Sequence, residues 1–154
     1  MSSFSSLDQL IDSFAGVLPP VHTMNSTSRA HISVLIHTIT YTSTIQLHSI
    51  LANTDARSST KSLATAQAAI GLLSTIDALR EHDDVAQFPV LNPTFAVLWG
   101  IVGGVFVKEV KRLRGLRSAS VRNQVREVDG MLSSLMMTMQ ALSGHSPLMG
   151  ELFF

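Results

Sequence analysis

The stretch FAVLWGIVGGVFVKEVKRLRG, residues 95–115, decides how the rest of the chain is interpreted. It begins with 13 consecutive residues without a polar side chain and then becomes strongly basic. Gly100 and Gly104 have the four-residue spacing of small residues that allows membrane helices to pack closely. The stretch therefore has two open interpretations: a membrane anchor, or a core helix of a soluble protein.

The length of the apolar run favours the core helix. As a helix, residues 94–107 would span ~21 Å at 1.5 Å per residue, whereas the hydrocarbon core of a bilayer is ~30 Å thick. After the run, Val110 and Leu113 continue the apolar seam of Phe106 while the other face becomes basic. We expect a buried helix. The alternative is a small membrane-anchored protein whose basic flank is cytosolic.

The whole chain is unusually apolar. Its 154 residues are enough for one domain. The mean hydropathy is +0.29 and only 14% of residues are charged, whereas an ordinary soluble domain has about 25%. This composition indicates either a membrane protein or a domain that keeps apolar surface for a partner. The net charge is zero, so no overall field attracts nucleic acid or lipid headgroups.

The first helix has clear start and stop signals. It is expected to begin at Ser6, which forms a capping box with Gln9, and to end at Gly16 before Pro19 and Pro20. Its apolar residues recur at helical spacing, which predicts one apolar face. These residues are Leu7, Leu10, Ile11, Phe14 and Ala15.

The segment of residues 29–51 gives conflicting signals. Its run VLIHTITYTSTI is rich in β-branched residues and alternates in the manner of a strand. Ile32, Leu35, Ile36 and Ile39 also fit one face of a helix. The chain offers no second strand candidate, and a single strand cannot satisfy its backbone hydrogen bonds alone. A helix is the favoured interpretation, with a strand as the alternative.

Three further helices complete the expected fold. One covers residues 58–81. The next begins at Asn92-Pro93, a strong start signal, and extends to about Arg117. The last begins near Ser118 or Ser120 and ends at Gly144, and it carries a heptad seam for packing along another helix. The seam consists of Val121, Val125, Val128, Leu132, Leu135, Met139 and Leu142.

These segments together predict an all-α protein. We expect about five helices in a compact helical bundle, because the links between them are short and no internal repeat is present. The bundle forms a single helical domain over residues 7–150, with terminal tails at residues 1–6 and 151–154.

No catalytic or metal-binding pattern stands out. The chain has no cysteine, which excludes disulfides, thiolate nucleophiles and cysteine-containing zinc sites. None of the six histidines has another at i+3 or i+4, the spacing that would bring two donors to one metal ion. The sequence contains no nucleophile elbow and no phosphate-binding loop, and no serine has a recognisable general base beside it. We expect a non-enzymatic protein with neither a cofactor nor a bound metal.

Two groups of side chains are candidates for an interaction surface. Met136 and Met137 flank the heptad seam, and methionine suits adaptable protein contacts, although filling the core is its alternative role. The basic residues after the apolar run could contact an acidic protein, although a solvated helix face is the alternative, and no aromatic residue is interleaved for stacking on bases. We expect a protein partner, or self-association through the last helix. The basic candidates are Lys108, Lys111, Arg112, Arg114 and Arg117.

Four pieces of the chain resemble a known family. LDQLIDSFAGVLPPV, HTITYTSTIQLHSIL, LNPTFAVLWGIVGGVFVKEVKRLR and HSPLMGEL are similar to the C-terminal part of the regulatory region of fungal zinc-binuclear-cluster transcription factors, particularly basidiomycete ones. The motifs that carry the resemblance keep the family's order over nearly the whole chain. They are Leu18-Pro19-Pro20, residues 44–48, Asn92-Pro93 with Trp99 and Glu109, and residues 147–150.

The resemblance implies a helical regulatory module that acts in transcription by binding proteins or small ligands. It also implies that residues 29–51 are helical and that the opening stretch is interior. The family binds DNA through a six-cysteine, two-zinc head, which this chain lacks, so we expect no direct sequence-specific DNA binding by it. The first residues show no secretory signal, and a nuclear or cytoplasmic location is expected.

Overall fold

The computed structural model describes residues 3–21, 27–82, 93–116 and 119–143. These residues form α-helices joined by turns, and the described part of the chain contains no strand. The expected all-α fold is confirmed. The helices are α1 (Ser3–Val17), α2 (Thr27–Ser49), α3 (Ala56–His82), α4 (Pro93–Arg114) and α5 (Ala119–Ser143).

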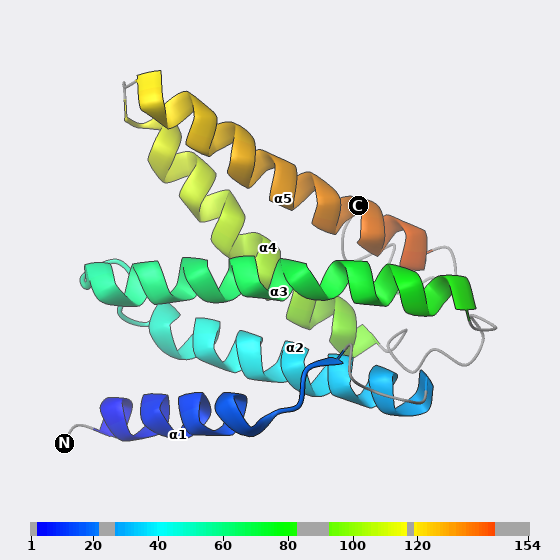
Figure 1. The fold of residues 1–154 in the computed structure, drawn as a ribbon. Coiled ribbons are helices and arrows are strands. Elements are labelled where there is room, and N and C mark those ends of the chain that lie inside the picture. The colour runs from blue at the N-terminus through cyan, green and yellow to red at the C-terminus, as the bar shows by residue number, and fades with distance from the viewer. Residues whose placement is uncertain (1–2, 22–26, 83–92, 117–118, 144–154) are drawn as a thin grey trace.

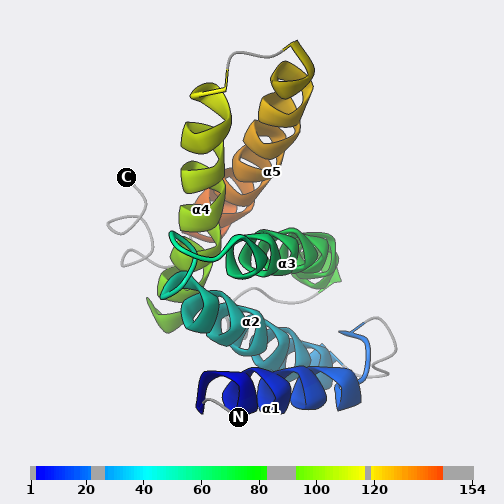
Figure 2. The same ribbon diagram turned by 90° about the vertical axis from the view of Figure 1, so that its left-hand side faces the viewer.

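The helices stack in layers (Figure 1 and Figure 2). α1 lies along the outer side of α2, and α2 packs against α3, which runs in the opposite direction. α4 packs against both α2 and α3, and α5 returns antiparallel along α4. The connected ends of α4 and α5 extend beyond α3, so these two helices form a projecting hairpin, called here the α4–α5 hairpin.

Helix α2 shows how a β-branched, threonine-rich segment becomes helical. The threonines at positions 38, 40, 42 and 44 are buried, and each hydroxyl donates to the carbonyl four residues earlier, at 2.8 to 3.2 Å. Because the helix itself satisfies these hydroxyls, the four threonines can be buried on two sides of α2 without hydrogen-bond partners from other helices. The favoured helical interpretation is confirmed, but Ile32 and Ile39 of the expected apolar face are exposed.

Two predicted helix boundaries are wrong. α1 begins at Ser3, so Ser6 lies inside the helix rather than at its N-cap, and residues 3–6, expected in a tail, are helical. α4 ends at Arg114 instead of near Arg117, because Gly115 turns the chain and its N–H bonds back to the last carbonyls of the helix.

The start of α3 is also two residues earlier than predicted. Asp55 is its N-cap, since its carboxylate accepts the backbone N–H of Arg57 at 3.2 Å and that of Ser58 at 2.9 Å. The Ser58 hydroxyl donates to the same carboxylate at 2.6 Å. These hydrogen bonds lower the pKa of Asp55 below its ordinary value. The helix therefore begins at Ala56, and Ser58 occupies its first turn.

Helix α4, which contains most of the apolar and basic stretch of residues 95–115, lies at the centre of the core. One side of it is buried against α2, α3 and α5, as the core interpretation predicts. The opposite side includes exposed Val97 and Val107. None of the described helices has the length and apolarity needed to cross a membrane. The buried side consists of Phe95, Ala96, Trp99, Val102, Gly103, Phe106, Val110 and Leu113.

The three glycines of α4 have different surroundings. A Cβ atom added at Gly103 would lie 3.3 Å from Cδ2 of Leu135, so this glycine allows α5 to approach α4 closely. Gly100 and Gly104 have no atom within 4 Å of an added Cβ. The spaced pair Gly100 and Gly104 therefore makes no close helix contact, and among the three glycines of α4 only Gly103 does so.

The heptad seam of α5 faces the core as predicted. The seam packs along α4 and, over part of its length, against α3. Its members are buried or half-buried, so the periodicity correctly identified the inner side of the helix. The buried residues are Val121, Val128, Leu135, Met139 and Leu142, and the half-buried ones are Val125 and Leu132.

Candidate functional site

The two methionines proposed as contact residues lie on the outer side of α5. The side chains of Met136 and Met137 are 43% and 65% exposed, whereas the adjacent seam residues Leu135 and Met139 are buried. The core-filling alternative therefore does not apply to this pair. They form an apolar site on a helix that is otherwise polar on its outer side.

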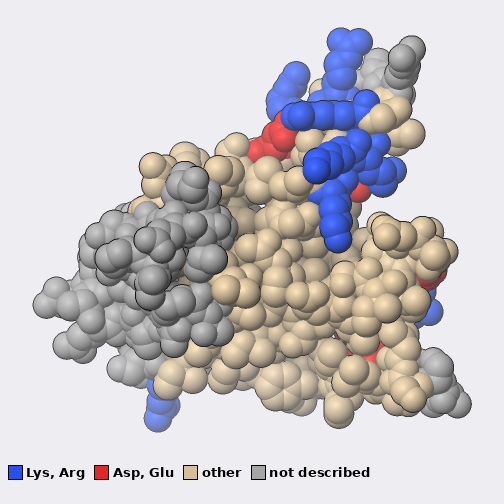
Figure 3. All heavy atoms as spheres, turned by 180° about the vertical axis from the view of Figure 1, so that it is seen from behind, with Lys and Arg blue, Asp and Glu red and all other residues tan. Residues whose placement is uncertain are grey.

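The basic candidates lie at the projecting end of the α4–α5 hairpin. Figure 3 shows lysines and arginines gathered at this end, with few acidic side chains among them. Two of the arginines are paired: Arg112 makes two hydrogen bonds to Glu109, at 2.6 and 2.7 Å, and Arg114 lies 3.1 Å from Asp129. The pairing with Glu109 raises the pKa of Arg112 above its ordinary value. Arg117 falls outside the described residues.

The structure does not bring the methionines and the basic residues into one surface. Met136 and Met137 are exposed on α5, whereas the described basic candidates, from Lys108 to Arg114, all belong to α4. The predicted surface therefore divides into an apolar site on α5 and a basic end of the hairpin.

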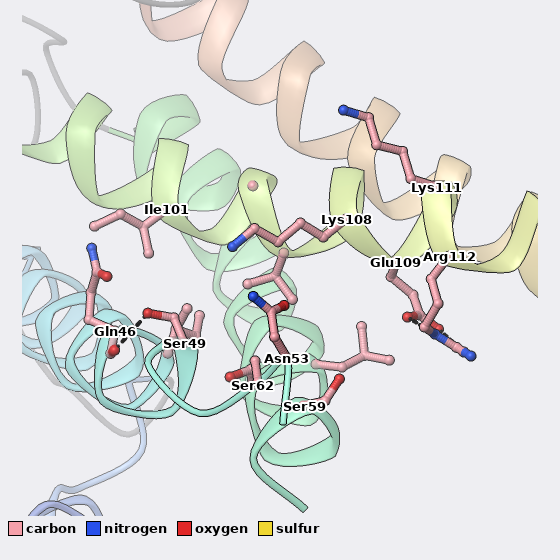
Figure 4. Close-up of a pocket in the computed structure, with 15 residues that line it drawn as sticks. Gln46, Ser49, Asn53, Ser59, Ser62, Ile101, Lys108, Glu109, Lys111 and Arg112 are labelled. Carbon is pink, nitrogen blue, oxygen red and sulfur yellow. Dashed lines mark hydrogen bonds and ion pairs between the residues drawn. The ribbon is translucent and has the colours of Figure 1, made fainter. Parts of the chain in front are cut away.

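A groove of about 610 Å³ lies beside this basic end, between α4, the end of α2 and the start of α3 (Figure 4). We call it the α2–α4 groove. Its apolar lining includes Ile45, Leu63, Ile101 and Val105 from three helices and Ala52 from the turn between α2 and α3. Its polar lining includes the amides of Gln46 and Asn53 and the hydroxyls of Ser49, Ser59 and Ser62.

The charged side chains of the groove are not equivalent. Three cations and one carboxylate line it, Lys108, Lys111, Arg112 and Glu109, for a formal charge of 3 − 1 = +2. Figure 4 shows Lys108 reaching across the opening toward Gln46, whereas Lys111 points away from it. Arg112 is neutralised by Glu109. Lys108 is thus the cation that the groove presents, and no carboxylate among the described residues pairs with it.

Two further features of the groove come from single residues. Ser62 is 5% exposed, and its hydroxyl has no hydrogen-bond partner among the residues that the structure describes. A buried hydroxyl without a partner is unusual, because it costs free energy of roughly 1–3 kcal/mol. Gly104 has no side chain to occupy the groove and open space where one would stand.

A second polar cluster joins α1 to the bundle. In it, Nε2 of His48 lies 2.9 Å from Oδ1 of Asp8, and Nδ1 of the same ring lies 3.1 Å from Oγ of Ser58. Serine, histidine and aspartate in this order are the residue types of a hydrolase triad. Here, however, Ser58 and His48 are 1% and 2% exposed, and neither lines the α2–α4 groove. The cluster is a connection between helices, since its hydroxyl is buried and donates to Asp55.

Lys61 of α3 completes this connection. Its ammonium group bonds to both oxygens of Asp12, at 2.8 and 2.9 Å, and also to Asp8. Burial alone would raise the pKa of Asp8, but Lys61 and His48 outweigh it and lower the pKa below the ordinary 3.8. Burial alone would lower the pKa of Lys61, but Asp12 and Asp8 raise it above 10.5. We call Asp8, Asp12, His48 and Lys61 the α1 clamp.

Sequence patterns gave no sign of the α1 clamp or of the groove. Asp8 is 40 residues from His48 and 53 from Lys61, so no local spacing links them. The groove is formed by residues from three helices, each with an ordinary apolar or polar pattern. Within the described ranges, no three His, Asp or Glu side chains are grouped so that they could hold a metal ion. Comparison with protein-family models, curated proteins and solved structures gives no match for this chain.

Proposed function

We propose that this chain is a non-enzymatic helical module that regulates through binding, and that it engages another helix through the outer side of α5. In the simplest case the other helix is α5 of a second copy. The contact is helix packing around Met136 and Met137, and no covalent chemistry is involved. Direct sequence-specific DNA binding is not part of the proposal.

The observation that carries the proposal is the exposure of two neighbouring methionines beside a buried seam. Residues of the seam already hold α5 to α4, so the outer side is free to make a second contact without unfolding the helix. Methionine is flexible and polarisable, and it is frequent at adaptable binding surfaces. The low charged fraction of the chain, 14%, also supports a surface that is covered by a partner.

The role in transcription is supported by the resemblance to fungal regulatory regions. The motifs over most of the chain resemble those of such a region in their order, and the five described helices are compatible with it. We therefore propose transcription regulation as the process and the nucleus as the place of action. A tagged chain expressed in a fungal cell should accumulate in the nucleus, and uniform distribution in the cytoplasm would contradict this part of the proposal.

Sedimentation of purified protein tests the α5 contact. The double variant Met136→Glu with Met137→Glu places two carboxylates on the outer side of α5, where desolvation opposes association. We expect the wild type to sediment as an oligomer and the double variant as a monomer at the same concentration. Circular dichroism should show the same helix content for both, because the two side chains are exposed in the monomer.

Gln124→Glu is the matched control. It adds a carboxylate to the exposed side of α5, 12 residues before Met136, and should leave the oligomer intact. Loss of helix content in the double variant would show that the methionines support the core, contrary to the proposal. A wild type that stays monomeric up to the highest soluble concentration would exclude self-association through α5.

A further inference from the structure

We propose that the α2–α4 groove binds a small amphipathic organic anion, namely a carboxylate attached to an alkyl or aryl body of medium length. The carboxylate would lie against Lys108 at the opening, and the apolar body would lie against the lining from α2, α3 and α4. This site is separate from the outer side of α5 and does not depend on the helix contact proposed above.

The size and lining of the groove suit the apolar body of such a ligand. Pockets for small organic ligands measure about 300–1,000 Å³ and are mostly apolar with a few polar groups, and this groove has about 610 Å³. Ile45 is buried at its side, and Leu63, Ile101 and Val105 are half-buried. A ligand body covering them would remove apolar surface from water, at about 25 cal/mol per Å².

Lys108 provides the positive charge for the carboxylate of the ligand. Its ammonium group lies across the opening and lacks a carboxylate partner among the described residues (Figure 4). The other cation that faces this region, Arg112, is satisfied by Glu109 through two hydrogen bonds. The groove consequently offers one uncompensated positive charge beside an apolar lining, and a carboxylate on an apolar body complements both.

Polar groups within the groove add a second point of recognition. The Ser62 hydroxyl is buried without a partner in the described structure, so a ligand oxygen or a water carried with the ligand would satisfy it. Gln46 and Asn53, whose amides also line the groove, lie near the Lys108 side chain in Figure 4. These donors favour an oxygen-bearing headgroup over a purely apolar ligand.

Gly104 keeps the groove open. A glycine inside a helix costs about 1 kcal/mol relative to alanine, and at this position a Cβ would meet no atom within 4 Å. Helix packing therefore does not require glycine here, in contrast to Gly103. A larger side chain at position 104 would occupy the groove while leaving α4 and its neighbours in place.

The test is a titration of the purified chain with decanoate below its micelle concentration, followed by calorimetry. We expect saturable binding at one site, and binding at least about tenfold weaker for the neutral analogue decanol. Lys108→Met should weaken decanoate binding by roughly tenfold or more, since a charge-assisted hydrogen bond is lost. Lys111→Met, which removes a lysine that points away from the groove, should change it less than about twofold.

A pair of glycine variants locates the site. Gly104→Leu should abolish decanoate binding, whereas Gly100→Leu should leave it unchanged. Gly100 has equally open space but does not line the groove, and helix side chains lean toward the N-terminus, away from it. Circular dichroism should show both variants to be as helical as the wild type.

Several outcomes would overturn the proposal. They are the absence of saturable decanoate binding, equal affinity for decanol, equal weakening by Lys108→Met and Lys111→Met, or binding that survives Gly104→Leu. The last result would place the ligand elsewhere, for example on the exposed apolar residues of α1. Gly104→Leu should not alter sedimentation of the protein, so failure of this proposal and failure of the α5 contact are read from different measurements.

Discussion

Helices α4 and α1 are attached to the molecule in opposite ways. α4 buries a continuous apolar side between three other helices, with Trp99 fully buried. α1 has no buried residue, and its contacts with the bundle include the carboxylates of Asp8 and Asp12 and the edge-to-face contact of Phe4 with His48. Four of its large apolar side chains are exposed, those of Leu7, Leu10, Phe14 and Val17, whereas Phe4 and Ile11 are half-buried.

The difference shows that amphipathic sequence does not by itself decide which side of a helix is attached. Apolar contacts are non-directional and scale with buried area, so the buried side of α4 resists displacement along its whole length. The α1 clamp depends on a few groups at defined distances, and each can be removed singly. We therefore expect α1 to open locally at a lower free energy than the rest of the bundle.

Removal of the largest core side chain should have the largest effect. Trp99→Ala should lower the free energy of unfolding by roughly 3–5 kcal/mol, because it leaves a cavity between α4 and its neighbours. Urea denaturation followed by circular dichroism measures the change. Val97→Ala, on the exposed side of the same helix, should change stability by less than about 1 kcal/mol. Similar losses for the two variants would contradict the central position of Trp99.

Removal of the α1 clamp should have an intermediate and local effect. Asp8→Ala takes away the acceptor of both His48 and Lys61, and should cost about 1–3 kcal/mol. Hydrogen exchange should become faster in α1 and remain unchanged in α4. Asp12→Ala removes a more exposed carboxylate that contacts only Lys61, and should cost less than about 1 kcal/mol. Equal acceleration of exchange in α1 and α4 would show that α1 does not open separately.

Acidification should produce the smallest and most gradual change. The pKa of Asp8 is lower in the folded chain than its ordinary 3.8, so its stabilisation is present above that value and is lost as the pH falls through the folded pKa. The pKa of Lys61 is raised above 10.5, so its stabilisation is present below that value and is lost as the pH rises further. Methyl NMR resonances of Leu7 and Leu10 should move at both limits before those of α4. Constant α1 resonances below pH 3.8 would contradict the clamp.

The fold was largely predictable because helix start and stop signals and apolar periodicity are encoded in short stretches of sequence. The start of α4 at Pro93 and the seam of α5 both follow from short patterns, and both are confirmed. The orientation of α1 was not predictable in this way. Its apolar residues recur at helical spacing, but the attachment depends on Asp8 meeting His48 and Lys61 from distant parts of the chain.

In helix α2 the folded structure overrides the secondary-structure propensity of the sequence. Its β-branched run favours a strand, whereas the helical spacing of its apolar residues and the lack of a pairing strand favour a helix. The structure shows the physical reason, since each threonine hydroxyl from position 38 to position 44 bonds within the helix. The candidate surface was predicted less well, because exposure of Met136 and Met137 is a local property whereas the groove requires three helices to meet.

The position of Trp99 also gives the molecule an internal optical reporter. The chain has one tryptophan and one tyrosine, and they lie on α4 and α2, which pack against each other. Emission from the buried indole is expected to shift to longer wavelength when water reaches it. Excitation energy transferred from Tyr41 to Trp99 should fall when the two helices separate. Intrinsic fluorescence, measured without any added label, can therefore distinguish loss of the α2–α4 contact from hydration of the core.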